Sequence, residues 1–191
     1  MNATASSPRT WLSRSELLLL AGVLLMLISS VFPGVWAWKR RERLKMAQLD
    51  LRVLVEAVER YHREYGVWPG ALESMLTDVR FGRGESNAQV LNTLRAEEGT
   101  GNPQHRGNEQ QLVFLEVEPA GAGVSGLDAR GAFLDPWGSE YQMVFDSNYD
   151  NVCEVEKSMY GRLIGQGHAI WSCGPDRQSD TPDDLLTWSS H

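Results

Sequence analysis

The sequence predicts an α+β protein in which one long N-terminal helix packs on a small antiparallel β-sheet. Leu17–Trp38 forms a stretch of 22 residues without a charged side chain. Apolar residues then recur at steps of three and four as far as Tyr65, which is the spacing of one helical face. Short apolar runs bounded by turn residues follow nearer the C-terminus, as expected of strands. The 191 residues leave room for one domain of about 100–150 residues beside the helix.

The first expected element is a transmembrane helix half over residues 12–38, which follows a short polar leader of residues 1–11. At 1.5 Å per residue the 22 uncharged residues extend ~33 Å, enough to cross a hydrocarbon core of ~30 Å. The alternative is a secretory signal cleaved after Ala37, which would release a soluble domain. The apolar core is longer than the about 7–15 residues usual in such signals, and Glu16 adjoins it, so a retained anchor is favoured.

Two residues of this segment stand out. A carboxylate such as that of Glu16 at the edge of a span is costly unless a cation pairs with it. Pro33 removes a backbone hydrogen bond and therefore predicts a bend. Nothing from Lys39 to Tyr65 breaks a helix, so the helix is expected to continue as an amphipathic half over residues 39–66 that ends at a glycine cap.

The C-terminal globular domain is expected over residues 67–191. A turn at residues 67–70 leads into a short second helix, and a long polar loop over residues 80–111 contains one helical turn. Three antiparallel strands are expected to complete the domain. The second helix is predicted at Ala71–Val79, the helical turn at Val90–Leu94, and the strands at Gln111–Val117, Tyr141–Phe145 and Ala169–Cys173.

Charge is distributed unevenly along the chain. The formal net charge is −7, from 18 Lys and Arg against 25 Asp and Glu. The acidic remainder argues against a nucleic-acid surface and is compatible with divalent cations. Cations are more numerous after the apolar stretch than before it, so the positive-inside rule places the C-terminal domain in the cytoplasm. The cations after the stretch are Lys39, Arg40, Arg41, Arg43 and Lys45, and those before it are Arg9 and Arg14.

Two clusters of oxygen-bearing residues are candidate calcium ligands. The segment 172–184 is rich in carboxylates and hydroxyls, which suit a cation that takes 6–8 oxygens; the alternative is a solvated acidic loop. Asp146, Asn148 and Asp150 begin like a calcium loop, but Lys157 stands where that loop needs a glutamate, so a hairpin turn is favoured. The ligands expected in the first segment are Ser172, Asp176, Asp180 and Asp183.

The two cysteines, Cys153 and Cys173, are too few for a disulfide framework or a zinc site. They form either one bridge, if the domain is extracytoplasmic, or two packed thiols. No Ser, His and Asp order, Cys and His pair or phosphate loop is present in the sequence, so no enzymatic activity is expected.

The N-terminal pattern resembles that of type IV pilin-like proteins. With Leu12 as the first mature residue, Glu16 stands fifth and Pro33 twenty-second, where that family carries a glutamate and a proline. Over residues 12–79 and 112–188 the chain resembles the major pseudopilins of type II secretion (the G family). The motifs that carry this resemblance are Tyr-His-Arg-Glu-Tyr-Gly-Val-Trp-Pro at 61–69, Asp-Pro-Trp-Gly-Ser-Glu-Tyr at 135–141, Trp-Ser-Cys-Gly-Pro-Asp at 171–176 and Asp-Asp-Leu-Leu-Thr-Trp at 183–188.

The resemblance implies a pilin-like fold and a structural role without enzymatic activity. Such a subunit polymerises through its N-terminal helix into a pseudopilus, and an ATPase elsewhere in the machine drives protein export across the outer membrane. The implied partners are further copies, other pseudopilins, the inner-membrane secretion platform and the prepilin peptidase. The implied location is the inner membrane, crossed once, with the C-terminal domain in the periplasm, against the charge count.

Residue roles follow from the same resemblance. The peptidase would cut between Trp11 and Leu12, although the family carries a glycine where Trp11 stands, and the new N-terminus would be methylated. Glu16 would bind the N-terminal ammonium of a neighbouring copy. Asp176 and Asp183 match the carboxylates that hold calcium in the family. A minor pilin of an adhesion or DNA-uptake pilus, and a signal-anchored periplasmic binding module or enzyme with residues 80–134 as a lid, remain the alternatives.

Overall fold

The computed structural model describes residues 13–70, 77–155 and 162–188, and it describes only the backbone of residues 14, 27–33 and 162. The chain divides into two units, Met1–Arg41 and Glu42–His191. The residues of the expected leader cleavage, Trp11 and Leu12, lie outside the described part of the chain.

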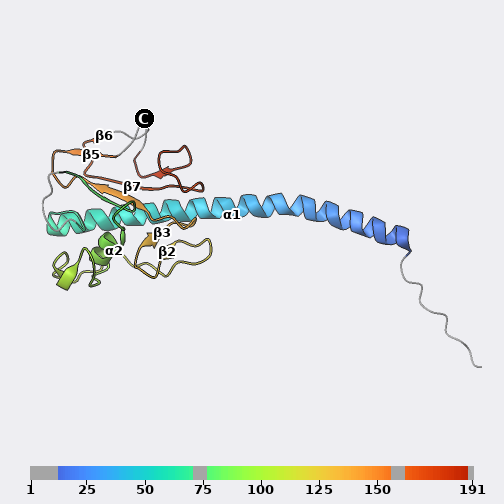
Figure 1. The fold of residues 1–191 in the computed structure, drawn as a ribbon, viewed down its shortest axis with the longest axis horizontal. Helices are drawn as coiled ribbons and strands as arrows, with labels where there is room; N and C mark the ends of the chain where they lie inside the picture. Colours follow the sequence, from blue (N-terminus) through green and yellow to red (C-terminus); the bar gives the residue numbers. More distant parts are fainter. Residues whose placement is uncertain (1–12, 71–76, 156–161, 189–191) are drawn as a thin grey trace, which may run out of the picture. The chain divides into compact units, whose positions relative to one another are not determined.

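Helix α1 (Arg14–Tyr65) contains 52 residues (Figure 1). It ends at Gly66, whose φ of 72° allows its backbone N–H to reach the carbonyl of His62 at 2.8 Å. The predicted single helix and its glycine cap are therefore confirmed. The backbone stays helical at Pro33, whose side chain lies outside the described residues.

No helix within the described ranges is both long and apolar enough to cross a membrane. The transmembrane half expected over residues 12–38 stays a prediction.

The second unit contains a four-stranded antiparallel sheet in the order β1, β4, β7, β8. The two central strands are those predicted from the sequence, within a residue at each end, and their register aligns Met143 with Ile170. The predicted small antiparallel sheet is thereby confirmed. The strands are β1 (Val79–Phe81), β4 (Gln142–Phe145), β7 (His168–Ser172) and β8 (Leu185–Leu186).

Side-chain alternation along β4 explains how the sheet is covered on both faces. Successive strand residues point to opposite faces. Met143 and Phe145 belong to the apolar cluster that includes α1, whereas Val144 belongs to a second cluster with Trp171 and Trp188. All four residues of β4 are therefore buried, as in a central strand covered on both sides.

Helix α1 contributes one apolar stripe to the larger cluster. Leu54, Val58 and Tyr61 are spaced by four and three residues, so they share a face, and each is at most 2% exposed. Trp68 extends this contact beyond the helix, because its indole N–H donates to the carbonyl of Asp146 at 2.9 Å. The aromatic residues of this region pack the helix onto the sheet.

Shorter elements complete the second unit. Figure 1 shows α2, β2 and β3 on the opposite side of α1 from β5, β6 and β7. The helical turn predicted near Val90 is confirmed as α2. The remaining elements are α2 (Ala88–Leu94), a 3₁₀ turn (Pro103–His105), the antiparallel pair β2 (Gly126–Leu127) and β3 (Phe133–Leu134), and the antiparallel pair β5 (Val152–Glu154) and β6 (Arg162–Ile164).

The strand predicted at Gln111–Val117 is wrong. The backbone N–H groups of Phe114 and Leu115 both donate to the carbonyl of Leu94, at 2.8 and 3.2 Å, so the segment is bonded to the end of α2. Asn108 holds the start of the segment, because its side chain bonds both the N–H and the carbonyl of Leu112. These contacts take the place of a strand ladder.

The helix predicted at Ala71–Val79 is not tested over most of its length, since residues 71–76 lie outside the described part. Its last residue is not helical. Val79 begins strand β1 and pairs with Phe145 of β4. The β-branched side chain of Val79 favours an extended backbone. Its pairing with a central strand outweighs the helix that the sequence predicts at this position.

Candidate functional site

The N-terminal end of α1 is closed by Ser13 and Glu16. The backbone N–H of Ser13 donates to Oε2 of Glu16 at 2.7 Å, and the backbone N–H of Glu16 donates to Oγ of Ser13 at 3.3 Å. This reciprocal pair is a capping box, in which a serine and a glutamate three residues later satisfy two free helix N–H groups. The signal for this cap, Ser-x-x-Glu, is present in the sequence.

The helix residues after Glu16 are apolar on every side. Leu17–Leu20 occupy four successive directions about 100° apart, since an α-helix has 3.6 residues per turn. The eight large apolar side chains are 54–76% exposed. A helix that is apolar all round requires an apolar environment on all sides. These residues are Leu17, Leu18, Leu19, Leu20, Val23, Leu24, Leu25 and Met26.

In the second unit, the start of the acidic segment is held by a buried carboxylate. Asp135, which is 1% exposed, accepts a hydrogen bond at 2.6 Å from the hydroxyl of Ser172. Its other oxygen accepts from the backbone N–H groups of Trp137 and Ser139, at 3.0 and 2.9 Å. Burial raises the pKa of Asp135, and these donors oppose that rise. The contact joins the Asp-Pro-Trp-Gly turn to the Trp-Ser-Cys-Gly segment, 37 residues later.

The acidic segment is closed by its own carboxylates. Thr181 Oγ1 donates to Asp183 Oδ1 at 2.8 Å, and the backbone N–H of Asp176 donates to Asp183 Oδ2 at 3.2 Å. The backbone N–H of Asp180 donates to Asp184 Oδ2 at 2.8 Å. The hydroxyl of Thr181 lowers the pKa of Asp183, so this carboxylate is ionised at neutral pH.

Two of the four expected calcium ligands lie together. Asp176 and Asp183 are joined by the bond just described, and both are ionisable oxygen donors of the type that calcium prefers. Ser172 is directed to Asp135, and Asp180 is bonded through its backbone to Asp184. Within the part of the chain that the structure covers, no group of three or more His, Cys, Asp or Glu side chains is placed to hold a metal ion.

The alternative calcium cluster bends the chain after β4, but it is not the predicted hairpin turn, because β4 pairs with β1 and β7 while β5 pairs with β6. Asp146 accepts the backbone N–H groups of Asp150 and Asn151 at 3.2 and 3.0 Å, and Asn148 accepts that of Asp150 as well. Both oxygens of the Asp146 carboxylate therefore close the chain after β4.

Cys153 and Cys173 are both free and buried in the structure. The thiol of Cys153 donates to the carbonyl of Val144 at 3.5 Å, and that of Cys173 lies 3.8 Å from the hydroxyl of Ser179. Burial raises the pKa of Cys153 to about 12 and that of Cys173 to about 11. Both are therefore protonated at neutral pH and are weak nucleophiles.

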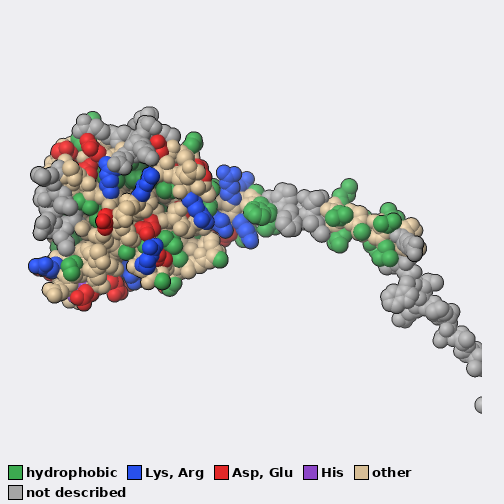
Figure 2. All heavy atoms as spheres, in the orientation of Figure 1, with side chains coloured by type: hydrophobic (Ala, Val, Ile, Leu, Met, Phe, Trp, Pro, Cys, Tyr) green, Lys and Arg blue, Asp and Glu red, His purple; other side chains and the backbone are tan. Residues whose placement is uncertain are grey.

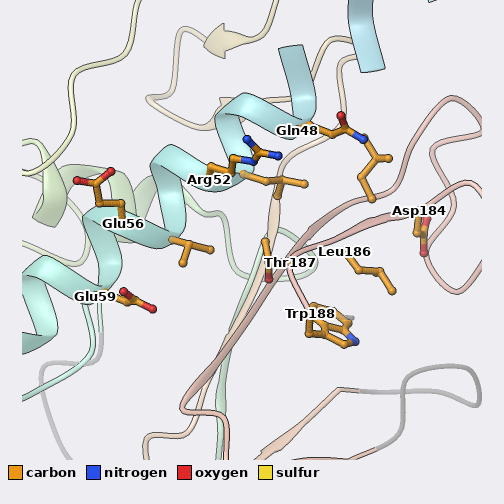
Figure 3. Close-up of a pocket in the computed structure, with 11 residues that line it drawn as sticks. Gln48, Arg52, Glu56, Glu59, Asp184, Leu186, Thr187 and Trp188 are labelled. Atoms are coloured by element: carbon orange, nitrogen blue, oxygen red, sulfur yellow. The ribbon is translucent and has the colours of Figure 1, made fainter. Parts of the chain in front are cut away.

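A groove of about 650 Å³ runs between α1 and the end of the sheet. In Figure 3, Arg52, Glu56 and Glu59 line it from α1, opposite Leu186 and Trp188 of the last strand region. Sequence reasoning missed this groove because its two walls are far apart in the chain. The full lining is Gln48, Leu51, Arg52, Val55, Glu56, Glu59, Asp184, Leu185, Leu186, Thr187 and Trp188.

The lining of the groove combines apolar side chains such as Leu51 and Leu186 with the charged side chains of Arg52, Glu56 and Glu59. Its one hydroxyl, on Thr187, accepts the backbone N–H of Ile170 at 3.3 Å. No protein-family model, curated protein or solved structure matches this chain.

Proposed function

We propose that this chain is a membrane-anchored, pilin-like subunit that polymerises through its N-terminal helix into a type II secretion pseudopilus. The observation that carries the proposal is the apolar circumference of α1 between Leu17 and Met26, where the large apolar side chains are 54–76% exposed. At 25 cal/mol per Å² such side chains cost about 1.5–3 kcal/mol each when left in water. Lipid and neighbouring helices are the environments that would cover all sides of one helix.

Glu16 supports the polymer because its carboxylate is held at the exposed N-terminal end of α1. Oε2 accepts the N–H of Ser13 and fixes the position of the side chain at the helix end. The exposed side chain can be reached by a cation of another copy, such as an N-terminal ammonium. A pair of this kind strengthens in a low dielectric and penalises any register that leaves it unmade.

The location that goes with this proposal is the inner membrane, with residues 12–38 as the single span and the C-terminal domain in the periplasm. The further partners are other pseudopilins, the inner-membrane platform and the prepilin peptidase. The chain contributes a building block, and the export of proteins across the outer membrane is driven by other components.

Calcium is proposed as a ligand of the acidic segment, held by Asp176 and Asp183. The backbone N–H of Asp176 is bonded to the Asp183 carboxylate, so the two residues are neighbours, and a divalent cation would be stabilised by oxygen ligands from both. The expected effect is a more rigid segment 172–184 and a higher melting temperature of the domain.

The decisive experiment is cross-linking of the full-length chain in native membranes, compared with Glu16→Gln. The wild type is expected to give a ladder of multimers that Glu16→Gln loses. Glu109→Gln is the matched control, since Glu109 is an exposed carboxylate in the second unit. Identical ladders for the wild type and Glu16→Gln would refute the role of this carboxylate, and a monomer in every case would refute the polymer.

Mass spectrometry of the native N-terminus tests the anchor independently. A chain starting at Leu12 or earlier retains the apolar helix and supports the proposal. A chain starting at Trp38 is a released domain and overturns it.

The calcium proposal is tested by calorimetry of the full chain in detergent, with calcium or with a chelator. The wild type is expected to melt at a higher temperature with calcium, and Asp176→Ala with Asp183→Ala is expected to remove the difference. Equal melting of the wild type under both conditions would end the calcium proposal without affecting the polymer.

A further inference from the structure

A group of aromatic and cationic side chains follows the apolar part of α1 within the first unit. Trp36 and Trp38 are 70% and 62% exposed, and Lys39, Arg40 and Arg41 directly after them are exposed as well. We call these five residues the collar. Figure 2 shows Lys and Arg side chains on the helix next to exposed hydrophobic ones.

Glu42 is the carboxylate next to the collar in the sequence, and within the described residues it makes no ion pair with the collar cations. No ion pair or side-chain hydrogen bond joins Lys39, Arg40 or Arg41 to an acidic group in that part of the chain. Three adjacent like charges repel one another, so their position is unfavourable unless an anion lies nearby.

Helix geometry spreads the collar around the whole circumference. At about 100° per residue the three cations point in three different directions, while their Cα atoms rise only ~3 Å along the axis. Trp36 and Trp38 are about 200° apart and so lie on opposite sides of the helix. The collar therefore surrounds the helix within ~7.5 Å along its axis and does not form a stripe along one face.

The distribution of the collar around the helix indicates whether its partner is a protein or a membrane surface. A second helix or a folded protein contacts one side of a helix, and charges that serve it would recur every three or four residues along that side. The headgroup layer of a membrane surrounds a helix on all sides at one depth. Only the second arrangement matches both the narrow axial spread and the full circumference of the collar.

The position of the collar along α1 fits the same partner. From Leu17 to Trp36 the helix extends ~29 Å, close to the ~30 Å thickness of a hydrocarbon core. Tryptophan side chains are favoured at the level of the headgroups, where the ring is in the apolar layer and the N–H is hydrated. A guanidinium group can donate two parallel hydrogen bonds to two oxygens of one phosphate, whereas a lysine ammonium attracts a phosphate as a point charge.

We propose that the collar binds the phosphate headgroups of anionic phospholipids and sets the depth of α1 in the bilayer. This inference rests on the proposed membrane anchor and names the lipid class that the anchor selects. It also gives Lys39, Arg40 and Arg41 a role that does not depend on which side of the membrane the C-terminal domain lies. The charge excess after the apolar stretch is then compatible with a periplasmic domain.

The experiment places the full-length chain in vesicles that contain brominated phosphatidylglycerol or brominated phosphatidylcholine at equal mole fraction. Bromine quenches tryptophan fluorescence at contact distance, and subtracting the signal of the Trp36→Phe, Trp38→Phe variant isolates the collar. We expect phosphatidylglycerol to quench the fluorescence more strongly than phosphatidylcholine. Each cation should raise the preference for phosphatidylglycerol by up to about fivefold at low salt. The preference should weaken at high salt, because the charges are exposed.

Two variants test the assignment of the cations. Lys39→Gln with Arg40→Gln and Arg41→Gln should quench equally with both lipids, whereas Lys39→Arg with Arg40→Lys and Arg41→Lys should keep the preference. The charge-matched control Arg63→Gln with Arg83→Gln and Arg106→Gln removes three exposed cations of the second unit and should also keep it.

Several results would overturn the inference. Equal quenching of the wild type by both lipids at low salt, or a preference that survives the glutamine substitutions, shows that the collar does not select anionic lipid. Loss of the preference when inorganic phosphate replaces chloride at equal ionic strength identifies a free anion as the ligand. A changed cross-linking ladder in the glutamine variant with unchanged lipid preference assigns the cations to a second copy. Failure of the wild type to float with vesicles of either composition refutes the membrane anchor itself.

Discussion

Replacing Ser172 by alanine is the sharpest perturbation of the acidic segment, because sequence and structure assign this hydroxyl different roles. The sequence suggests a calcium ligand. In the structure the hydroxyl donates to Asp135 at 2.6 Å and accepts the backbone N–H of Gly174 at 3.1 Å. Ser172 is fully buried and Asp135 is 1% exposed, so water cannot replace the lost group without a local opening.

The magnitude follows from the two lost bonds. A hydrogen bond to a charged group contributes about 1.5–3 kcal/mol, and a buried N–H without a partner costs about 1–3 kcal/mol. Partial relaxation of the segment reduces the sum, so we expect Ser172→Ala to lower the free energy of unfolding by about 2–4 kcal/mol. For a chain of this size the melting temperature should fall by about 5–15 °C.

The pH dependence of this loss has a definite sign. Burial raises the pKa of Asp135 in the folded state, so its contribution to stability is present at low pH and is lost as the pH rises through that pKa. The Ser172 hydroxyl stabilises the ionised form. The deficit of Ser172→Ala is therefore largest above the folded pKa of Asp135 and smaller below it.

The assay is thermal unfolding of the full chain in detergent with chelator present, followed by near-ultraviolet circular dichroism at several pH values. Ser125→Ala is the matched control, since no side-chain bond of Ser125 is found among the described residues, and it should change stability by less than about 0.5 kcal/mol. If Ser172→Ala melts with the control at neutral pH, the hydroxyl does not support Asp135 and the reasoning fails.

Three further predictions concern other parts of the second unit. Gly174→Ala places a Cβ against the backbone oxygen of Asp183 at a φ of +64°, and should destabilise more than Gly84→Ala, where φ is +90° with open space around; calorimetry compares the two. Cys153 and Cys173, with pKa values raised to about 12 and about 11, should resist alkylation at mildly alkaline pH until denaturant is added, as mass spectrometry can show. Burial lowers the pKa of His168, so stability contributed by its neutral form is lost as the pH falls through that pKa; His168→Gln should flatten this loss in acid titrations of stability.

Sequence reasoning succeeded where periodicity and caps decide the structure. Helix α1 has an uninterrupted helical pattern and a glycine after its last residue, and both were sufficient to place its end at Tyr65. The strands β4 and β7 are short apolar runs between turn residues, which is the signal of a buried strand. These features are local, so one sequence contains them in full.

Prediction from the sequence failed where contacts between residues far apart in the chain decide the structure. The run Gln111–Val117 has the composition of a strand, but Asn108 and the end of α2 take up its backbone groups. The groove beside α1 has one wall at residues 48–59 and another at residues 184–188, and no local pattern links them. The capping box of Ser13 and Glu16 does not depend on distant contacts, because its Ser-x-x-Glu signal is local to the sequence.

In the structure, the motifs that carry the resemblance to pseudopilins contain residues that contact distant segments of the chain. Trp68 of the first motif donates to the carbonyl of Asp146, and Asp135 of the second accepts the hydroxyl of Ser172 in the third. These residues therefore contribute to folding whether or not calcium binds. The proposed assembly function depends on a separate set, the apolar helix and Glu16. It follows that Ser172→Ala should lower stability and leave the cross-linked ladder intact, while Glu16→Gln should remove the ladder and leave the melting of the second unit unchanged.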